Sequence, residues 1–409
     1  MSGLYFRLSL MRDAPVLRAK AQDFFGLALE AHIVELYSNA VGTFLASIAK
    51  PYFVDPVFYK FSSSFFEELS EKRWVDLLTA EYGIEGLMSS NPEGFEVLDL
   101  GQLKAVDQVV GQILDYQRRR ILSLTQRSTA LASLIGETPP AVGPPAFLVS
   151  PYVIAIDRLS IGTNVKIAIA AVKKKKPEEK LFAVIAVSRD FLSSSKDLQA
   201  IINSFSSIPA DGYLVWICDF KDWQEDSEIL KTFANFVHDL SVSSGNKEVI
   251  NLFGGYFSTV LTARQLLGAS VQGVGMAEFR DPFVTGGGFA KRYYVPISHQ
   301  FVSVDLADDL RDADSSTFGC SCTQCGSGAT PGTMSVQALA QHFVETRTQE
   351  FHRASAMSAL AIADMLKRDA AALMRVKMSG VAGLASAHGR RLEVWEWTLR
   401  DLVKSHVVA

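Results

Sequence analysis

Cysteine is scarce in this chain, and its placement argues against a disulfide-stabilised fold. Only four cysteines occur in 409 residues, and three of them, Cys320, Cys322 and Cys325, fall within six positions. The fourth, Cys218, stands alone in an apolar run and has the character of a core thiol. This is not the spread of cysteines that a disulfide framework requires. We therefore expect a reducing, cytoplasmic location and clustered thiols that bind a metal.

Long apolar runs and an excess of positive charge are also missing. No stretch reaches the roughly 18 to 20 uninterrupted apolar residues of a membrane span. The first residues, MSGLYFRLSLMRDAP, lack the apolar core of a signal peptide, so we expect no membrane association. The formal net charge is −4. Any contact with nucleic acid therefore has to come from a local basic patch and not from the overall charge.

The chain does contain an alternation of short apolar runs with amphipathic segments. The runs FAVIAVS, DGYLVWICDF and VINLFGGY are each followed by a stretch with helical character, whereas residues 18–48 read as one helical region. This alternation predicts parallel βαβ units, and the continuously apolar runs predict a sheet that is covered on both faces. The length is ordinary for a (β/α)8 barrel with insertions.

We therefore predict an α/β fold, a (β/α)8 TIM barrel with a C-terminal zinc-binding subdomain and a helical tail. The barrel is expected to occupy residues 1–314, with helical insertions near its N-terminus. Residues 315–409 are expected to hold the metal subdomain and the C-terminal helices. The segment KRYYVPISHQFVSVD reads as a hairpin or an extended excursion just before that boundary.

The cysteine cluster has the residue types of a closed, structural zinc site. Three soft thiolates and one imidazole complete a tetrahedral shell and leave no open position for catalysis. A surface loop without metal is the alternative, but clustered free thiols have no packing purpose there. His342 and His352 both lie on a predicted helix, ten residues apart and near one face. Spacing alone leaves both histidines open as the fourth ligand.

The cysteine hook and several barrel segments resemble the tRNA-guanine transglycosylase superfamily, which contains the queuine and archaeosine tRNA-ribosyltransferases. That family has a (β/α)8 barrel and a structural zinc bound by Cys-x-Cys-x2-Cys and a distant histidine. About 25 residues separate the last cysteine from the histidine in the family, and 26 separate Cys325 from His352 here. The resemblance therefore implies Cys320, Cys322, Cys325 and His352 as the zinc ligands.

The resemblance extends from about residue 50 to residue 360 and implies roles for four residues. PYFVDPVFYKF stands where the family has its TDSGGFQ strand, which implies that Asp55 is the acid/base at the substrate. SPYVIAID resembles the strand whose final aspartate reads the guanine edge, which implies that role for Asp157. VSR and DGYLVWICDF stand where the family has QGG and DGYAIGGL, so Ser188 and Trp216 are expected at the substrate.

Two departures from the family pattern affect the expected chemistry. The family nucleophile is the aspartate that ends the segment GVDMFD, and Gly273 occupies that position here. The glycine pair of DGYAIGGL is replaced by Trp216 and Ile217, and Trp216 would fill the space beside the base or stack on a different ligand. These departures indicate a divergent member, nearer to the branch that inserts 7-deazaguanine derivatives into DNA than to the tRNA enzymes.

Base exchange at a glycosidic carbon needs a carboxylate at the sugar, a proton donor for the departing base and a polar edge that reads the incoming base. Such groups converge at the carboxyl ends of barrel strands. Asp219 and Glu278 are the candidates for a displaced nucleophile, and Arg280 for substrate binding. Each carboxylate could instead have a structural role in a turn, a helix cap or a surface ion pair. We favour a structural role over a catalytic one for Asp219 and Glu278.

The resulting hypothesis is a pentosyltransferase that exchanges a guanine-type base for a 7-deazaguanine derivative in DNA or tRNA. Its expected partners are the nucleic acid, a purine or 7-deazapurine base, and further subunits in a homodimer or a heteromeric complex. Lys291–Tyr294 combine charge with rings that suit unstacked bases. The alternatives are a catalytically inactive subunit that binds nucleic acid or a protein partner, and a different lyase or hydrolase on the same scaffold.

Overall fold

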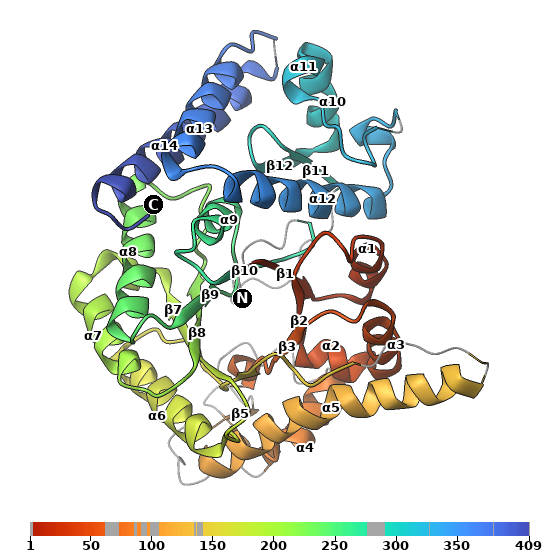
Figure 1. Ribbon diagram of the computed structural model, residues 1–409, viewed down its shortest axis with the longest axis vertical. Helices are drawn as coiled ribbons and strands as arrows, with labels where there is room; N and C mark the ends of the chain where they lie inside the picture. The colour runs from red at the N-terminus through yellow and green to blue at the C-terminus, as the bar shows by residue number, and fades with distance from the viewer. Residues whose placement is uncertain are drawn as a thin grey trace.

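An eight-stranded parallel sheet, nearly closed as a barrel, forms the centre of the molecule, and helices lie between its strands (Figure 1). The fold class predicted from the sequence is thereby confirmed. The structure is a computed structural model. It describes residues 3–61, 73–85, 88–90, 96–98, 106–134, 136, 142–275, 291–326, 328–378 and 380–408.

The strands follow one another around the barrel in the order β3-β2-β1-β10-β9-β8-β7-β6. Their bounds are β1 Gly3–Leu8, β2 Gly26–Glu30, β3 Tyr52–Asp55, β6 Leu148–Val149, β7 Leu181–Ser188, β8 Gly212–Cys218, β9 Glu248–Asn251 and β10 Ala269–Gln272. At the seam between β3 and β6, the Ala146 N–H donates to the Tyr52 carbonyl at 2.7 Å. The rings of Phe53 and Phe147 stack across the same seam, with centroids 4.7 Å apart.

Aromatic rings fill the amino-terminal half of the barrel interior. Tyr5 packs on Phe53, and Phe147 continues this layer to Phe182, with centroids 5.6 Å and 4.2 Å apart. Gly212 makes room for the layer, because a Cβ there would lie 2.3 Å from the Phe182 ring. Since side chains alternate along a strand, residues two positions beyond these rings also point into the barrel.

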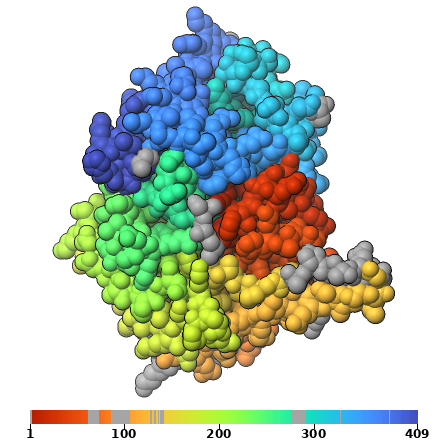
Figure 2. Space-filling view, in the orientation of Figure 1, coloured from red at the N-terminus to blue at the C-terminus, as the bar shows by residue number. Residues whose placement is uncertain are grey.

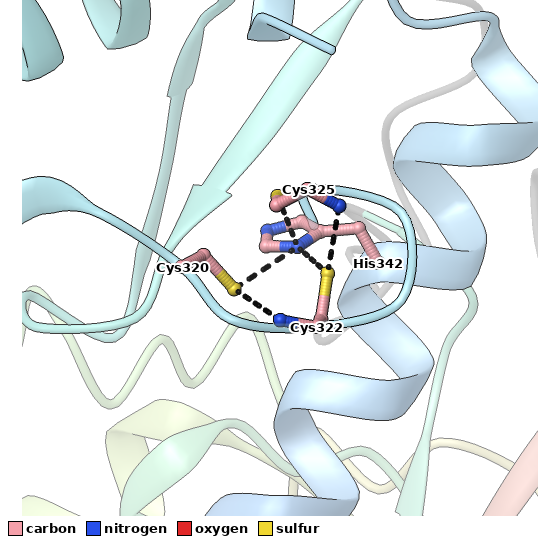
Figure 3. A group of neighbouring side chains, drawn as sticks. All are labelled: Cys320, Cys322, Cys325 and His342. Atoms are coloured by element: carbon pink, nitrogen blue, oxygen red, sulfur yellow. Dashed lines mark hydrogen bonds between the residues drawn. The ribbon is translucent and has the colours of Figure 1, made fainter. Parts of the chain in front are cut away.

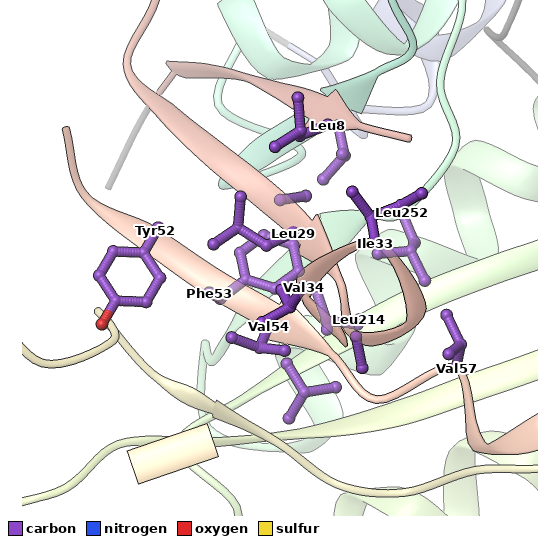
Figure 4. Close-up of a cluster of buried hydrophobic side chains, with 14 of the residues drawn as sticks. Leu8, Leu29, Ile33, Val34, Tyr52, Phe53, Val54, Val57, Leu214 and Leu252 are labelled. Atoms are coloured by element: carbon purple, nitrogen blue, oxygen red, sulfur yellow. The ribbon is translucent and has the colours of Figure 1, made fainter. Parts of the chain in front are cut away.

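Branched apolar side chains are also buried along these strands. Figure 4 shows such side chains of β1, β2, β3 and β8, with Leu8, Leu29, Val54 and Leu214 among those labelled. Every residue of β1, β2, β3 and β8 is buried. The expectation of strands that are covered on both faces is therefore confirmed for these four.

Helices cover the outside of the barrel. They are α1 Ala14–Ala19, α2 Ala31–Leu36, α3 Ser38–Ile48, α6 Arg158–Lys174, α7 Ser195–Ser206, α8 Ser227–Ser243, α9 Tyr256–Ala263 and α12 Val336–Ser355. Because α12 packs against both α9 and α1, it closes the ring of helices. The barrel therefore draws on residues on both sides of the expected boundary at residue 314.

Two insertions depart from the simple βα repeat. Between β3 and β6 lie α4 Arg73–Tyr82, the antiparallel pair β4 Met88–Ser90 and β5 Glu96–Leu98, and α5 Val106–Leu134. Between β10 and α12 lie the antiparallel hairpin β11 Arg292–Val295 and β12 Gln300–Ser303, then α10 Val304–Ala313, α11 Ser315–Phe318 and a cysteine-containing loop. The expected hairpin is confirmed.

The C-terminal tail is a helical pair, α13 Ala359–Met374 and α14 Ala382–Lys404, and α14 packs on α8. Figure 2 shows this tail and the hairpin insertion massed at one end of the molecule, while α5 runs along the opposite end. Among the described helices, none combines the length and the apolar character needed to cross a membrane.

One expectation about secondary structure is wrong. Residues 18–48 do not form one helical region, because β2 interrupts them. The five residues of β2, GLALE, are too few to show a period of two, and alanine and leucine favour a helix by propensity. Pairing with β1 on one side and β3 on the other outweighs that preference.

Candidate functional site

The loop that precedes α12 brings three cysteines and one histidine together. The ligand atoms of Cys320, Cys322, Cys325 and His342 all lie within 4.8 Å of one another (Figure 3). The Nδ1 atom of His342 is 3.7, 3.2 and 3.6 Å from the three Sγ atoms in that order. A tetrahedral zinc ion with bonds of about 2.3 Å to sulfur and 2.0 Å to nitrogen holds its ligands about 3.5 to 3.8 Å apart. The cluster can therefore hold such a metal ion.

The histidine of this cluster is His342, so the choice of His352 from the family spacing is wrong. His342 is fully buried, whereas His352 is exposed near the end of α12. Ten residues of α-helix advance about 15 Å along the axis. Two histidines can share a helix face and still lie too far apart for one of them to reach a loop that the other contacts.

Neighbouring groups hold the imidazole of His342 in place. Its Nε2 lies 2.7 Å from the Tyr294 carbonyl, and the ring of Tyr293 stacks on it with centroids 4.3 Å apart. A proton on Nε2 leaves the lone pair of Nδ1 directed at the thiols. Without a metal ion, burial lowers the pKa of His342, but its hydrogen bonds to Cys320 and Cys325 outweigh burial and raise the pKa to about 9, so a metal ion that binds Nδ1 has to displace a proton from it.

The segment Lys291–Tyr294 does not offer aromatic rings for stacking on bases, and that expectation is wrong. Lys291 and Arg292 are exposed, but both tyrosines are buried. The Tyr293 hydroxyl lies 3.3 Å from the Cys325 sulfur, and the Tyr294 hydroxyl donates to Glu350. Because β11 packs against α12 and Tyr293 contacts Cys325, these rings contribute to the cysteine cluster and the core.

A second polar cluster lies inside the barrel at the carboxyl ends of its strands. We call Arg7, Glu30, Asp55 and Tyr152 the strand-end cluster. Arg7 and Asp55 lie two residues beyond Tyr5 and Phe53, and therefore point into the barrel above the aromatic layer. Each side chain is at most 1% exposed. This is the end of a (β/α)8 barrel at which active sites are built.

Arg7 joins the two carboxylates of the cluster. Its Nη1 lies 3.2 Å from Glu30 Oε1 and 3.6 Å from Asp55 Oδ2. Its Nη2 donates to the Leu252 carbonyl, and its guanidinium lies 3.5 Å above the centre of the Phe253 ring. Glu30 and Asp55 are opposite each other in the register of β2 and β3. One cation thus holds two adjacent carboxylates in a buried site.

Asp55 is buried in the strand-end cluster, and its surroundings are those that suit a proton donor. Its carboxylate accepts the Tyr152 hydroxyl at 3.0 Å and the Val57 N–H at 2.9 Å. Burial raises its pKa, and the charge of Arg7 opposes that rise without cancelling it. A carboxyl group with a raised pKa keeps its proton at higher pH and is suited to donating it.

Trp216 closes one side of the strand-end cluster. It is fully buried on β8, with its ring 4.8 Å from Phe253 and 5.0 Å from Tyr59, both measured between centroids. Tyr152 meets its edge at 6.2 Å. The space beside Asp55 is therefore filled by aromatic side chains.

Asp157 and Ser188 lie apart from this cluster. Asp157 is exposed, and its carboxylate accepts the Ser160 N–H at 2.8 Å as the N-cap of α6. Hydrogen bonds from the Ser160 hydroxyl and from the Ser160 N–H lower the pKa of Asp157. Ser188 caps the short helix Arg189–Ser193 and accepts the Asp190 N–H at 3.4 Å. The structure gives both residues a capping role, and Asp157 does not join Asp55 in the buried cluster.

Asp219 follows β8 in a left-handed conformation with a φ of 57°. Its side chain is 48% exposed and pairs with Lys221 at 2.8 Å. Asp219 therefore forms a surface ion pair, which is the structural role that we favoured for it over a catalytic one. Glu278 and Arg280, the other candidates from the sequence, lie outside the described residues.

Sequence reasoning missed Arg7 and Glu30. Both are charged residues near the carboxyl end of a short apolar strand, as Asp55 is, but neither matches a motif of the family that the sequence resembles. Glu30 was not predicted as a site residue, because the residues of β2 were expected to be helical. Arg7 was not predicted, because the expected chemistry calls for carboxylates at the strand ends.

No protein-family model matches the sequence, and no curated protein matches it. The resemblance to tRNA-guanine transglycosylases therefore rests on the motifs quoted above.

Proposed function

We propose that this protein is a transglycosylase-like enzyme that exchanges a guanine-type base for a 7-deazaguanine derivative in a polynucleotide. The observation that carries the proposal is the strand-end cluster. Two carboxylates lie side by side at the carboxyl ends of adjacent barrel strands, bridged by Arg7. Breaking a glycosidic bond calls for such a pair of carboxyl groups in unlike environments.

In this proposal Asp55 moves the proton. It gives a proton to the departing base and takes one from the incoming base. Tyr152 orients the carboxyl group through its hydroxyl, and Arg7 offsets the negative charge that remains when the proton leaves. DNA and tRNA offer the same sugar carbon and the same purine, so the experiment has to distinguish them.

The metal of this proposal is zinc, held by Cys320, Cys322, Cys325 and His342. With four protein ligands its shell is closed, so zinc would stabilise the loop and take no part in the base exchange. Lys20 pairs with Glu345, which also accepts the Thr323 N–H at 2.9 Å. These contacts connect the cysteine loop to α12 and to the end of α1.

Incorporation of labelled guanine tests the proposed function. The purified protein is incubated with labelled guanine and either double-stranded DNA or tRNA, and label retained in the polymer is measured. Asp55→Asn should abolish incorporation, whereas Glu35→Gln should retain it, since Glu35 is a buried acid that pairs with Arg120 away from the cluster. Absence of incorporation into either polymer by the wild-type protein would contradict the proposal.

A catalytically inactive subunit is the second candidate. It is favoured by the aromatic side chains beside Asp55 and by the pairing of Asp219 with Lys221. Such a subunit would bind DNA or tRNA, measured by fluorescence anisotropy, without incorporating label. Binding by the wild-type protein without incorporation into either polymer would favour this candidate over the enzyme.

A further inference from the structure

We propose that a cavity beside the cysteine cluster is a binding site for a small zwitterion, of the class of free α-amino acids. The cavity has a volume of about 210 Å³ and lies between the turn of the β11–β12 hairpin, the cysteine loop, α12 and α13. No residue of the strand-end cluster lines it. The inference is therefore independent of the base exchange proposed above.

His299 is the buried histidine of the cavity wall. It is 4% exposed, and its ring stacks on the ring of Tyr256 with centroids 3.5 Å apart. Its Nδ1 lies 2.7 Å from a Glu350 oxygen, and because a carboxylate can only accept, Nδ1 donates and the neutral ring keeps a lone pair on Nε2. Nε2 is buried and has no hydrogen-bond partner among the described residues. A buried acceptor calls for a donor, which a ligand in the cavity can supply.

Two opposite charges line the same cavity. Arg353 is exposed on α12, and Asp369 is half-buried on α13. Neither side chain has an ion pair or a hydrogen bond within the part of the chain that the structure describes. Burial raises the pKa of Asp369, and the nearby His299 and Arg353 oppose that rise. A ligand that carries both an ammonium and a carboxylate group would give each of the two charges a partner.

The lining of the cavity argues against other classes of ligand. His299, Glu350 and Asp369 do not converge closely enough to hold a metal ion, since among the described residues the cysteine cluster alone has that spacing. An anion alone would meet two carboxylates, and a cation alone would meet Arg353. Sites for drug-sized molecules have roughly 300 to 1,000 Å³ and a mainly apolar lining. This cavity is smaller, and most of its lining residues are polar or charged.

The proposed complex uses each of these groups once. The carboxylate of the amino acid pairs with Arg353, and its ammonium group pairs with Asp369. A hydroxyl or amide group on its side chain donates to His299 Nε2, so the site favours a polar, uncharged amino acid over an apolar one. Thr317 and Cys320 also line the cavity, so the ligand would lie between the cysteine loop and α12.

Calorimetric titration tests the proposed ligand class. The full-length protein, supplied with zinc, is titrated separately with L-serine, L-threonine, L-asparagine and L-glutamine. We expect at least one of them to bind with a Kd below about 1 mM, and L-alanine, which lacks the side-chain donor, to bind at least about tenfold more weakly. Absence of binding by all four at about 10 mM would overturn the proposal and would mean that the cavity holds only water.

Two derivatives of the amino acid that binds best test the zwitterion directly. Its N-acetyl form has no ammonium group, and its carboxamide has no carboxylate. Each derivative should bind at least about tenfold more weakly than the parent amino acid, because one charge of the site is left without its partner. A derivative that binds as tightly as the parent would overturn the pairing with Asp369 or with Arg353, respectively.

Variants locate the binding in this cavity. Arg353→Met and Asp369→Asn should each weaken binding at least about tenfold, whereas His352→Ala, an exposed neighbour that does not line the cavity, should bind as the wild-type protein does. His299→Asn should abolish the preference over L-alanine, and asparagine tolerates the left-handed backbone of that position, with a φ of 54°. Thermal unfolding verifies that each variant is folded. Wild-type affinity in both Arg353→Met and Asp369→Asn would overturn the proposal.

Discussion

His342 Nε2 lies 2.7 Å from the carbonyl oxygen of Tyr294, and this contact determines which ring nitrogen faces the cysteines. The carbonyl can only accept, so the proton is placed on Nε2 and Nδ1 is left as the ligand atom. Tyr294 is part of β11, so the hairpin and α12 together orient the imidazole.

Metal content should depend on His342 and not on His352. We expect one zinc ion per wild-type chain, a loss of more than about 100-fold in zinc affinity for His342→Ala, and no change for His352→Ala. Elemental mass spectrometry and competition with a chelator measure both quantities. If His352→Ala loses zinc and His342→Ala keeps it, the ligand set of Figure 3 is wrong.

Arg7 should be far more important for stability than an exposed arginine in an ion pair. Arg7→Met leaves Glu30 and Asp55 buried without their shared cation, and should lower the free energy of unfolding by about 3 to 5 kcal/mol. Arg158→Met removes an exposed pair with Asp197 and should cost less than about 1 kcal/mol. Urea unfolding of the two variants gives the comparison. Equal effects would show that the strand-end cluster is not closed to solvent as described.

Tyr152→Phe should change the pH dependence of base exchange. The hydroxyl of Tyr152 hydrogen-bonds to Asp55 and lowers its pKa, so its removal should raise that pKa further. The limb on which activity falls as Asp55 loses its proton should then move to higher pH. Tyr213→Phe, which removes a hydrogen bond to the Phe205 carbonyl, is the matched control. An unchanged profile in Tyr152→Phe would exclude Asp55 as the titrating acid.

His388 should make the fold sensitive to mild acid. Burial lowers its pKa from 6.5 to about 4, so the unfolded chain binds a proton more readily than the folded chain. Stability is therefore lost as pH falls from 6.5 to 4, by about 3 kcal/mol in total. His388→Asn should lose less stability over that range, measured by urea unfolding at several pH values. A parallel decline in both proteins would show that His388 is protonated in the folded state.

Much of the fold follows from local sequence pattern. The apolar runs that became β7, β8 and β9 are continuous and are bounded by helical segments, so period and length agree. The cysteine hook likewise signals a metal site, because three thiols within six positions have no other common purpose.

The remaining features depend on contacts between distant segments. β2 is specified by its neighbours β1 and β3, which its own five residues cannot show. The choice between His342 and His352 depends on where the loop meets α12. Glu30 joins the strand-end cluster only because β2 and β3 lie side by side in the folded chain. Asp157 lies outside the cluster because its carboxylate caps α6.

Release of labelled guanine from a polymer tests the central claim, that the strand-end cluster performs base exchange. DNA or tRNA carrying labelled guanine is mixed with excess enzyme and unlabelled guanine, and free label is followed over a single turnover. We expect release by the wild-type protein and by Glu35→Gln, and at least 1,000-fold slower release by folded Asp55→Asn. Release at the wild-type rate from that variant would contradict the account.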